Sequence, residues 1–167
     1  MEKSNTIYTK SVITKKIVIE FKNIGKNIQN ILLEKLKECF EGKCISYGYI
    51  KRSSINIMNY SSGKIDGSNV IYEVLFSADI CSPIKGLELM GRVKSITKAG
   101  IRAVAITKDT DNPIIIFIAR DFKYQEQQFQ EIEINDKIKI LVIGSKFDLN
   151  DTNIYIIADL IKVFKKT

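Results

Sequence analysis

The sequence predicts an α+β unit, in which one helix packs on a small antiparallel sheet, followed by an all-β barrel of five strands. Two observations lead to this prediction. A helical repeat of apolar residues occurs once, over residues 28–40, and the other periodic segments alternate as strands do. Pro83 and Gly86 interrupt the chain between two groups of such segments, so we expect domains over residues 1–82 and 83–167.

The first strand is expected over residues 7–21, where Ile13, Ile17 and Ile19 share one side. A helix follows, with Asn27 suited to its N-cap and Gly42 to its end. An apolar stripe at helical spacing is expected to face the sheet, and it includes a cysteine that we therefore expect in the core: Ile28, Ile31, Leu32, Leu36, Cys39 and Phe40.

Three further strands are expected in the first domain, over residues 44–50, 54–60 and 70–80. The last alternates most regularly, and one of its faces is apolar throughout: Val70, Tyr72, Val74, Phe76, Ala78 and Ile80. Between the second and third strands, residues 61–69 are rich in Gly, Ser and Asp, which predicts an exposed loop.

The second domain is expected to contain strands only. Their predicted ranges are 87–96, 100–107, 114–119, 138–145 and 153–163. Their spacing, with turn signals at residues 97–100 and 109–113, favours an OB-type barrel whose long connection is residues 120–131. The apolar run at residues 113–118 leaves the register of the third barrel strand open.

The composition argues against catalysis. The 167 residues include no histidine, which excludes Ser-His-Asp and Cys-His nucleophilic sites and His-ligated zinc. The three cysteines form no C-x-x-C pair, and the aspartates Asp109, Asp111, Asp148 and Asp151 occur where Asp favours turn geometry. We therefore expect no catalytic residue, no metal site and no cofactor.

The net charge of +7 suits a partner with phosphates or acidic surfaces, although solubility and a bias towards Ile, Lys and Asn explain it equally well. No signal peptide opens the chain, and no apolar run approaches the ~20 residues that span a bilayer. We expect an intracellular protein without membrane contact.

Several strings, taken in order, carry a resemblance to a known family. They are Phe40-Glu41-Gly42-Lys43-Cys44, Tyr47-Gly48-Tyr49-Ile50, the loop with Gly63 and Gly67, Cys81-Ser82-Pro83-Ile84-Lys85-Gly86, V-x-x-I-T-K-A-G over residues 93–100, and residues 134–144 with 148–151. The chain resembles the RNA polymerase stalk subunit that archaea and eukaryotes share and that is counted seventh in eukaryotic polymerase II. Its loop has fewer glycines than the family pattern.

The resemblance implies a non-catalytic subunit whose first domain is a tip that docks on the large polymerase subunits at the base of the clamp. It also implies pairing with a second stalk subunit along the domain junction. The positions that match the docking tip are Gly63, Lys64, Ile65, Asp66 and Gly67, with Tyr47 and Gly48 on what we expect to be the adjoining strand. A Gly-rich loop permits close backbone approach, but an ordinary hairpin loop explains it too.

By the same resemblance, the barrel contacts nascent RNA. The candidate residues are Arg92, Lys94, Lys98, Arg102 and Lys108. Such a basic track binds the phosphate backbone with strong salt dependence. Residues 87–106 contain no aromatic, which predicts that a stacking platform is missing and argues against sequence-specific base reading. A solvated barrel surface is the alternative.

Two other functions and two sources stay open. A free-standing OB-fold RNA-binding factor of translation or RNA processing is the alternative function, and an enzyme acting on small molecules has the least support. The compositional bias is typical of AT-rich coding DNA, as in protists or large cytoplasmic DNA viruses. The protein would be nuclear in a cellular eukaryote, and cytoplasmic or in the virion if a large DNA virus encodes it.

Overall fold

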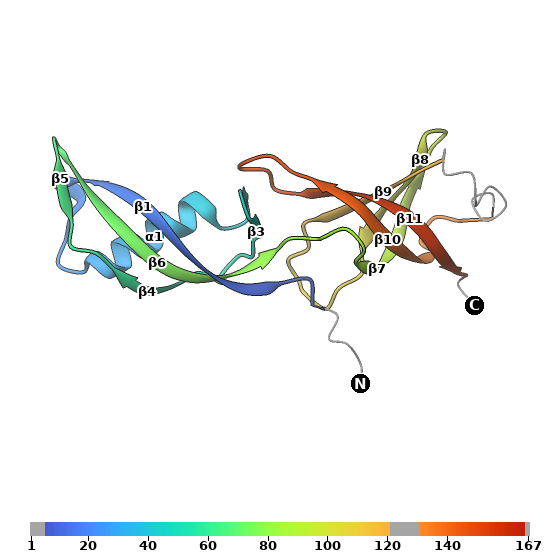
Figure 1. Ribbon diagram of the computed structural model, residues 1–167, viewed down its shortest axis with the longest axis horizontal. Coiled ribbons are helices and arrows are strands. Elements are labelled where there is room, and N and C mark those ends of the chain that lie inside the picture. Colours follow the sequence, from blue (N-terminus) through green and yellow to red (C-terminus); the bar gives the residue numbers. More distant parts are fainter. Residues whose placement is uncertain (1–5, 121–130, 166–167) are drawn as a thin grey trace.

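The computed structural model describes residues 6–120 and 131–165. Within these residues the chain forms an elongated molecule with a helix-bearing antiparallel sheet at one end and a closed barrel at the other (Figure 1). The predicted fold class is thereby confirmed.

The sheet is organised around one long strand, β6. β1 pairs antiparallel with β6 along its own whole length, from Thr9 opposite Ile80 to Glu20 opposite Asn69. The other side of β6 pairs in turn with β5, β4 and β3, and β2 pairs with β3. The bounds are β1 Thr9–Glu20, β2 Cys44–Ile45, β3 Gly48–Ile50, β4 Asn56–Tyr60, β5 Lys64–Asp66 and β6 Asn69–Cys81.

Helix α1, Ile28–Phe40, covers one face of this sheet, after a short 3-10 turn at Phe21–Asn23. Its N-cap is Asn27, as predicted, because the Asn27 side chain accepts a hydrogen bond from the Asn30 backbone N–H at 3.3 Å. Leu32 and Leu36 are fully buried against the predicted apolar face of β6. Cys39 is only partly buried, at the margin of this stripe, so its expected place in the core is wrong.

Two local predictions in the sheet need correction. Residues 44–50 form two strands, not one, with a turn at residues 46–47. The predicted loop over residues 61–69 contains a strand, because residues 64–66 form β5, which returns into β6 through a turn at Gly67 and Ser68. All three residues of β5 are exposed, so the expected exposure is confirmed. β5 has little strand propensity of its own, and it forms because it pairs with the edge of β6.

The barrel closes in the order β7, β8, β9, β11, β10 and back to β7. β9 and β11 are parallel, and the other neighbours are antiparallel. Ile114 lies opposite Ile154, which sets the register of the third barrel strand. The predicted long connection lies mostly outside the described residues. The bounds are β7 Glu88–Ile96, β8 Gly100–Ala105, β9 Ile114–Ala119, β10 Lys137–Lys146 and β11 Ile154–Phe164.

The sheet and the barrel share a packed junction. Four residues at this end of the sheet are buried in the same apolar cluster as the barrel interior: Tyr8, just before β1, and the strand residues Cys44, Tyr49 and Cys81. The β10–β11 loop also bonds to the sheet, since the Cys44 N–H donates to the Asp151 carbonyl at 2.7 Å. The orientation of the two parts is thus held by packing and backbone hydrogen bonds.

Carboxylates of the β8–β9 loop complete the junction. Asp111 accepts hydrogen bonds from the Tyr49 hydroxyl at 2.9 Å and the Arg52 guanidinium at 2.8 Å, and Asp109 pairs with Lys51 at 2.7 Å. Asp109 bonds to Thr107 within its turn, as predicted, but Asp109 and Asp111 also have partners in a segment 58 and 59 residues earlier, Lys51 and Arg52. Asp148 and Asp151 do stabilise a turn, since the Asp148 N–H donates to the Asp151 carboxylate at 2.8 Å.

Burial at the junction raises the pKa of its thiol and phenol groups, so that they stay protonated. Desolvation raises the pKa of the Cys44 thiol to about 11 and that of Cys81 to about 12, and it also raises the pKa of the Tyr49 phenol. Burial tends to raise the pKa of Asp109 too, but hydrogen bonds from Lys51, Thr107 and Thr6 outweigh it and lower that pKa below its usual value. The junction thus contains neutral thiols and phenols around an ionised pair.

Candidate interaction surfaces

The five predicted RNA-contacting residues are all exposed, but they do not form one group. Arg92 and Lys94 lie on β7, Lys98 in the β7–β8 turn and Arg102 on β8, where it pairs with Ser95 across a bulge at Lys94. Lys108 lies beyond the opposite end of β8, in the loop next to the junction. The structure therefore brings four of the five residues together.

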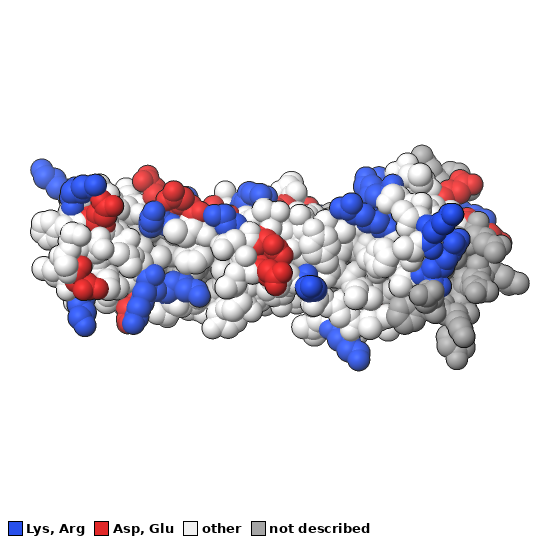
Figure 2. All heavy atoms as spheres, turned by 90° about the horizontal axis from the view of Figure 1, so that it is seen from above, with Lys and Arg blue, Asp and Glu red and all other residues white. Residues whose placement is uncertain are grey.

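A lysine from β10 extends this basic surface. Lys137 pairs directly with Arg92, and Figure 2 shows Lys and Arg side chains gathered over the barrel. Among residues 6–120 and 131–165, neither Arg92 nor Lys137 forms an ion pair. Like charges directly opposite each other are unfavourable in an isolated sheet, so an anionic ligand here would relieve repulsion. Lys137 is separated from Arg92 by 45 positions, and no local pattern in the sequence connects the two.

Aromatic side chains lie beside this surface, contrary to the prediction. Arg102 pairs with Phe117 on β9, and Phe117 pairs with Ile157 on β11. Phe117 and Tyr155 are 38% and 50% exposed. Residues 87–106 indeed lack aromatics, but the neighbouring strands supply them. The prediction considered one hairpin, whereas β9 pairs with β8 and β11 pairs with β9, which adds the third and the fifth strand.

The predicted docking loop forms the far end of the sheet, away from the barrel (Figure 1). Ile65 on β5 is 68% exposed, and Phe21 is 63% exposed. The Phe21 backbone N–H donates to the Ser68 carbonyl at 2.9 Å, which brings the two segments together. Gly67 adopts φ of +61° with open space around it. We call Phe21 and residues 63–68 the tip surface.

Gly63 has an internal role at this end. A Cβ on Gly63 would lie 2.4 Å from a methyl carbon of Val70 and 2.8 Å from the ring of Tyr72. Glycine is therefore required here by packing within the chain itself. Of the two predicted loop glycines, Gly67 is the one available for close approach by a partner.

Tyr47 and Gly48 lie elsewhere, and their expected place on the strand adjoining the loop is wrong. Tyr49 on β3 pairs with Cys81, whereas Ile65 on β5 pairs with Val70. These pairing points, Cys81 and Val70, are eleven positions apart along β6, a distance of about 36 Å at ~3.3 Å per residue. Gly48 has φ of +133°, and a Cβ there would lie 2.3 Å from the Cys81 carbonyl oxygen, so it is needed for the junction.

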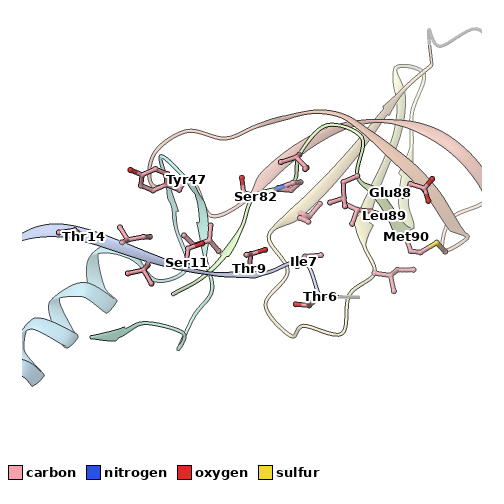
Figure 3. A pocket seen from close by; sticks show the side chains of 18 residues that line it. Thr6, Ile7, Thr9, Ser11, Thr14, Tyr47, Ser82, Glu88, Leu89 and Met90 are labelled. Atoms are coloured by element: carbon pink, nitrogen blue, oxygen red, sulfur yellow. The ribbon is translucent and has the colours of Figure 1, made fainter. Parts of the chain in front are cut away.

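A groove of about 800 Å³ lies between β1 and the start of the barrel (Figure 3). Tyr47 stands at one end and residues 88–90 at the other, with β1 along one side. Val12, Tyr47 and Ile84 in its lining are more than half exposed, at 57%, 61% and 69%. Among the described residues no strand pairs with the outer edge of β1, which leaves unpaired backbone groups along the groove.

The described residues contain no group of three or more His, Cys, Asp or Glu side chains that could hold a metal ion. In the same part of the chain, no helix has the length and apolar character needed to cross a bilayer.

No protein-family model matches the chain. The chain is 26% identical to a protein of Acanthamoeba polyphaga mimivirus over 173 aligned positions, which cover 93% of the chain and 83% of the viral protein. That protein is provisionally named a DNA-directed RNA polymerase subunit. The aligned region includes both the sheet and the barrel, so the chain is similar, over nearly its whole length, to a viral protein named as an RNA polymerase subunit.

Proposed function

We propose that this chain is a non-catalytic stalk subunit of a multisubunit DNA-directed RNA polymerase. The similarity to the mimivirus protein supports a polymerase subunit. The observation that carries the finer assignment is the combination of a helix-bearing sheet and an OB-type barrel in one elongated chain, in the order that the stalk family has. In this proposal residues 1–82 dock on the polymerase and residues 83–167 face the RNA.

The tip surface is the proposed contact with the polymerase core near the clamp. Phe21 and Ile65 expose large apolar side chains at the end of the molecule farthest from the barrel. Apolar side chains exposed together are typical of the buried centre of an interface. A Cβ added at Gly67 would meet nothing within 4 Å, so another backbone can approach this residue closely.

The groove is the proposed site of a second stalk subunit. Its lining combines exposed apolar side chains, Val12 and Ile84 among them, with the free edge of β1. An extended segment of a partner can pair with such an edge while its alternate side chains enter the groove. Lys10 and Lys15 on β1, next to the lining residues Ser11 and Thr14, would favour an acidic segment.

The barrel is proposed to contact nascent RNA through Arg92, Lys94, Lys98 and Arg102, with Lys137 added by the structure. Lys108 lies near the junction, apart from this group. It is proposed to contact the part of the RNA that runs from the barrel towards the polymerase. If the gene is viral, as that of the mimivirus protein is, the complex would work in the cytoplasm or virion.

Affinity purification of the tagged chain from its native source, followed by mass spectrometry, tests the proposal. We expect the two largest polymerase subunits in near-stoichiometric amounts. The double variant Phe21→Asp, Ile65→Asp should lose these subunits but keep a second stalk subunit, and Val12→Glu with Ile84→Asp should do the reverse. Each variant is the matched control of the other, since all four side chains are exposed.

Recovery of RNA or ribosomal material without polymerase subunits would contradict the proposal. That result would favour a free-standing OB-fold RNA-binding factor instead. Loss of both partners in both double variants would mean that the two surfaces are not separate.

A further inference from the structure

We propose that the outer face of the barrel carries a base-stacking platform for single-stranded RNA, formed by Phe117 and Tyr155 beside Arg102. The inference rests on the proposed RNA contact of the barrel. It adds that the barrel holds bases as well as phosphates.

The strand register places these three residues in two adjacent rows. Arg102 on β8 pairs with Phe117 on β9, which pairs with Ile157 on β11. In the next row, Ile115 on β9 pairs with Val104 on β8 and with Tyr155 on β11. Because neighbouring strands lie only about 4.8 Å apart, the Arg102 guanidinium lies beside Phe117, and Tyr155 lies one strand further on.

The aromatic side chains of these rows point away from the barrel interior. Ile116 and Ile118, which flank Phe117, are fully buried and fill the barrel. Phe117, Tyr155 and Ile157 are instead 38%, 50% and 49% exposed. They therefore contribute little to the barrel core, and their apolar surface is available to a ligand.

The chemistry of the two rows favours nucleic acid. Exposed aromatic rings stack on bases of any sequence, and neighbouring guanidinium groups bind phosphate or stack in turn. Neither row contains a carboxylate: one is Arg102, Phe117 and Ile157, and the other is Val104, Ile115 and Tyr155. The faces of the second and third strands are also where OB-type barrels bind oligonucleotides, and here these strands are β8 and β9.

The test measures fluorescence anisotropy of the full chain with two labelled probes of about twelve nucleotides, oligouridylate and an abasic chain of the same length. We expect Phe117→Leu and Tyr155→Leu each to weaken oligouridylate binding about tenfold, without changing affinity for the abasic chain. Phe117→Tyr should keep native affinity. Phe21→Leu, a similarly exposed aromatic at the far end, is the matched control.

The outcomes separate the platform from the RNA contact itself. If both leucine variants are folded by circular dichroism and bind oligouridylate as the native chain does, the platform is overturned. In that case Arg92→Gln would still weaken binding of both probes if the phosphate contact is real. If the native chain binds neither probe, the RNA contact is overturned and the platform with it, while association with polymerase is measured independently by purification.

Discussion

The sheet and the barrel of this molecule differ in whether their outermost strands find a partner for backbone hydrogen bonds. The barrel is closed, so each of its strands has neighbours on both sides. The sheet is open, and within the described residues the twelve-residue strand β1 pairs only with β6. One half therefore retains unpaired backbone groups at its edge and the other does not.

This difference determines what each half can recognise. A free edge can bind another polypeptide through backbone groups, whatever the partner's side chains. A closed barrel must use the side chains on its outer face, which here are cations and aromatic rings. The proposed protein partners of the sheet and the proposed RNA contact of the barrel agree with this difference.

The largest expected effect tests the glycines of the open sheet. Gly48→Ala should lower the free energy of unfolding by about 3–5 kcal/mol, because it adds strain at φ of +133° and moves the Cys81 carbonyl. Gly67→Ala, with φ of +61° but open space, should cost only about 1 kcal/mol. Urea unfolding of both variants measures this. Equal losses would show that the tip turn is as constrained as the junction.

The next effect tests whether the two halves unfold together. Asp111→Ala removes the acceptor of Tyr49, Arg52 and a backbone N–H, and should cost about 2–4 kcal/mol. The exposed Asp66, changed to Ala, is the control and should stay within about 0.5 kcal/mol. Denaturation curves that stay single in the variant would mean that apolar packing alone couples the halves.

A smaller effect concerns the cations of the barrel. The double variant Arg92→Gln, Arg102→Gln should weaken binding of single-stranded RNA about tenfold and reduce the slope of log K against log salt by about 1.4, or 0.7 for each phosphate contact. Titrations at several salt concentrations measure both quantities. Lys64→Gln at the tip is the control, and a similar loss there would indicate non-specific attraction by the net charge.

The smallest effect is the pH dependence of the junction. The pKa of Asp109 is lowered in the folded chain, so its stabilisation is present above about pH 4 and is lost as pH falls through the folded pKa. The hydrogen bond to Asp109 raises the pKa of Lys51, whose contribution is present below about pH 10.4 and is lost at higher pH.

Asp109→Asn should therefore cost about 1 kcal/mol near neutral pH and little below about pH 3, as measured by urea unfolding. The Lys51 side chain is 26% exposed, so the cost should fall somewhat in high salt. A difference from the native chain that is constant across the pH range would mean that the ion pair does not stabilise the junction.

Much of the fold could be predicted because it depends on local periodicity. Alternation in residues 70–80 predicted one face of β6 correctly, since neighbouring side chains of a strand point to opposite sides. Asn27 and the apolar stripe at helical spacing predicted α1, because an N-cap and a helical repeat both lie within a short stretch of sequence. The strand that was missed, β5, lacks this signal because it forms only where β6 offers a pairing edge.

The candidate sites depended on pairing between distant segments. The sequence identified Arg92 and Arg102 on one hairpin, but strand pairing in the barrel brings Lys137 opposite Arg92, Phe117 opposite Arg102 and Tyr155 onto the strand next to Phe117. The sequence also predicted that Tyr47 lies on the strand next to the loop at Gly63. In the structure, the strand that follows Tyr47 and the strand that follows Gly63 pair with opposite ends of β6. Register between strands that are far apart in sequence is set by the whole set of pairings.

The sequence by itself determined the types and order of most elements, the absence of histidine and the resemblance to a polymerase stalk subunit, because composition and short-range periodicity can be read along the chain. Only the tertiary structure decided which side chains share a surface. In the structure, the aromatic and basic residues of the barrel lie on neighbouring strands, and Tyr47 lines the groove. Asp109 and Asp111 contact the sheet at the junction. Those neighbours follow from closure and packing, which bring together residues that no local pattern connects.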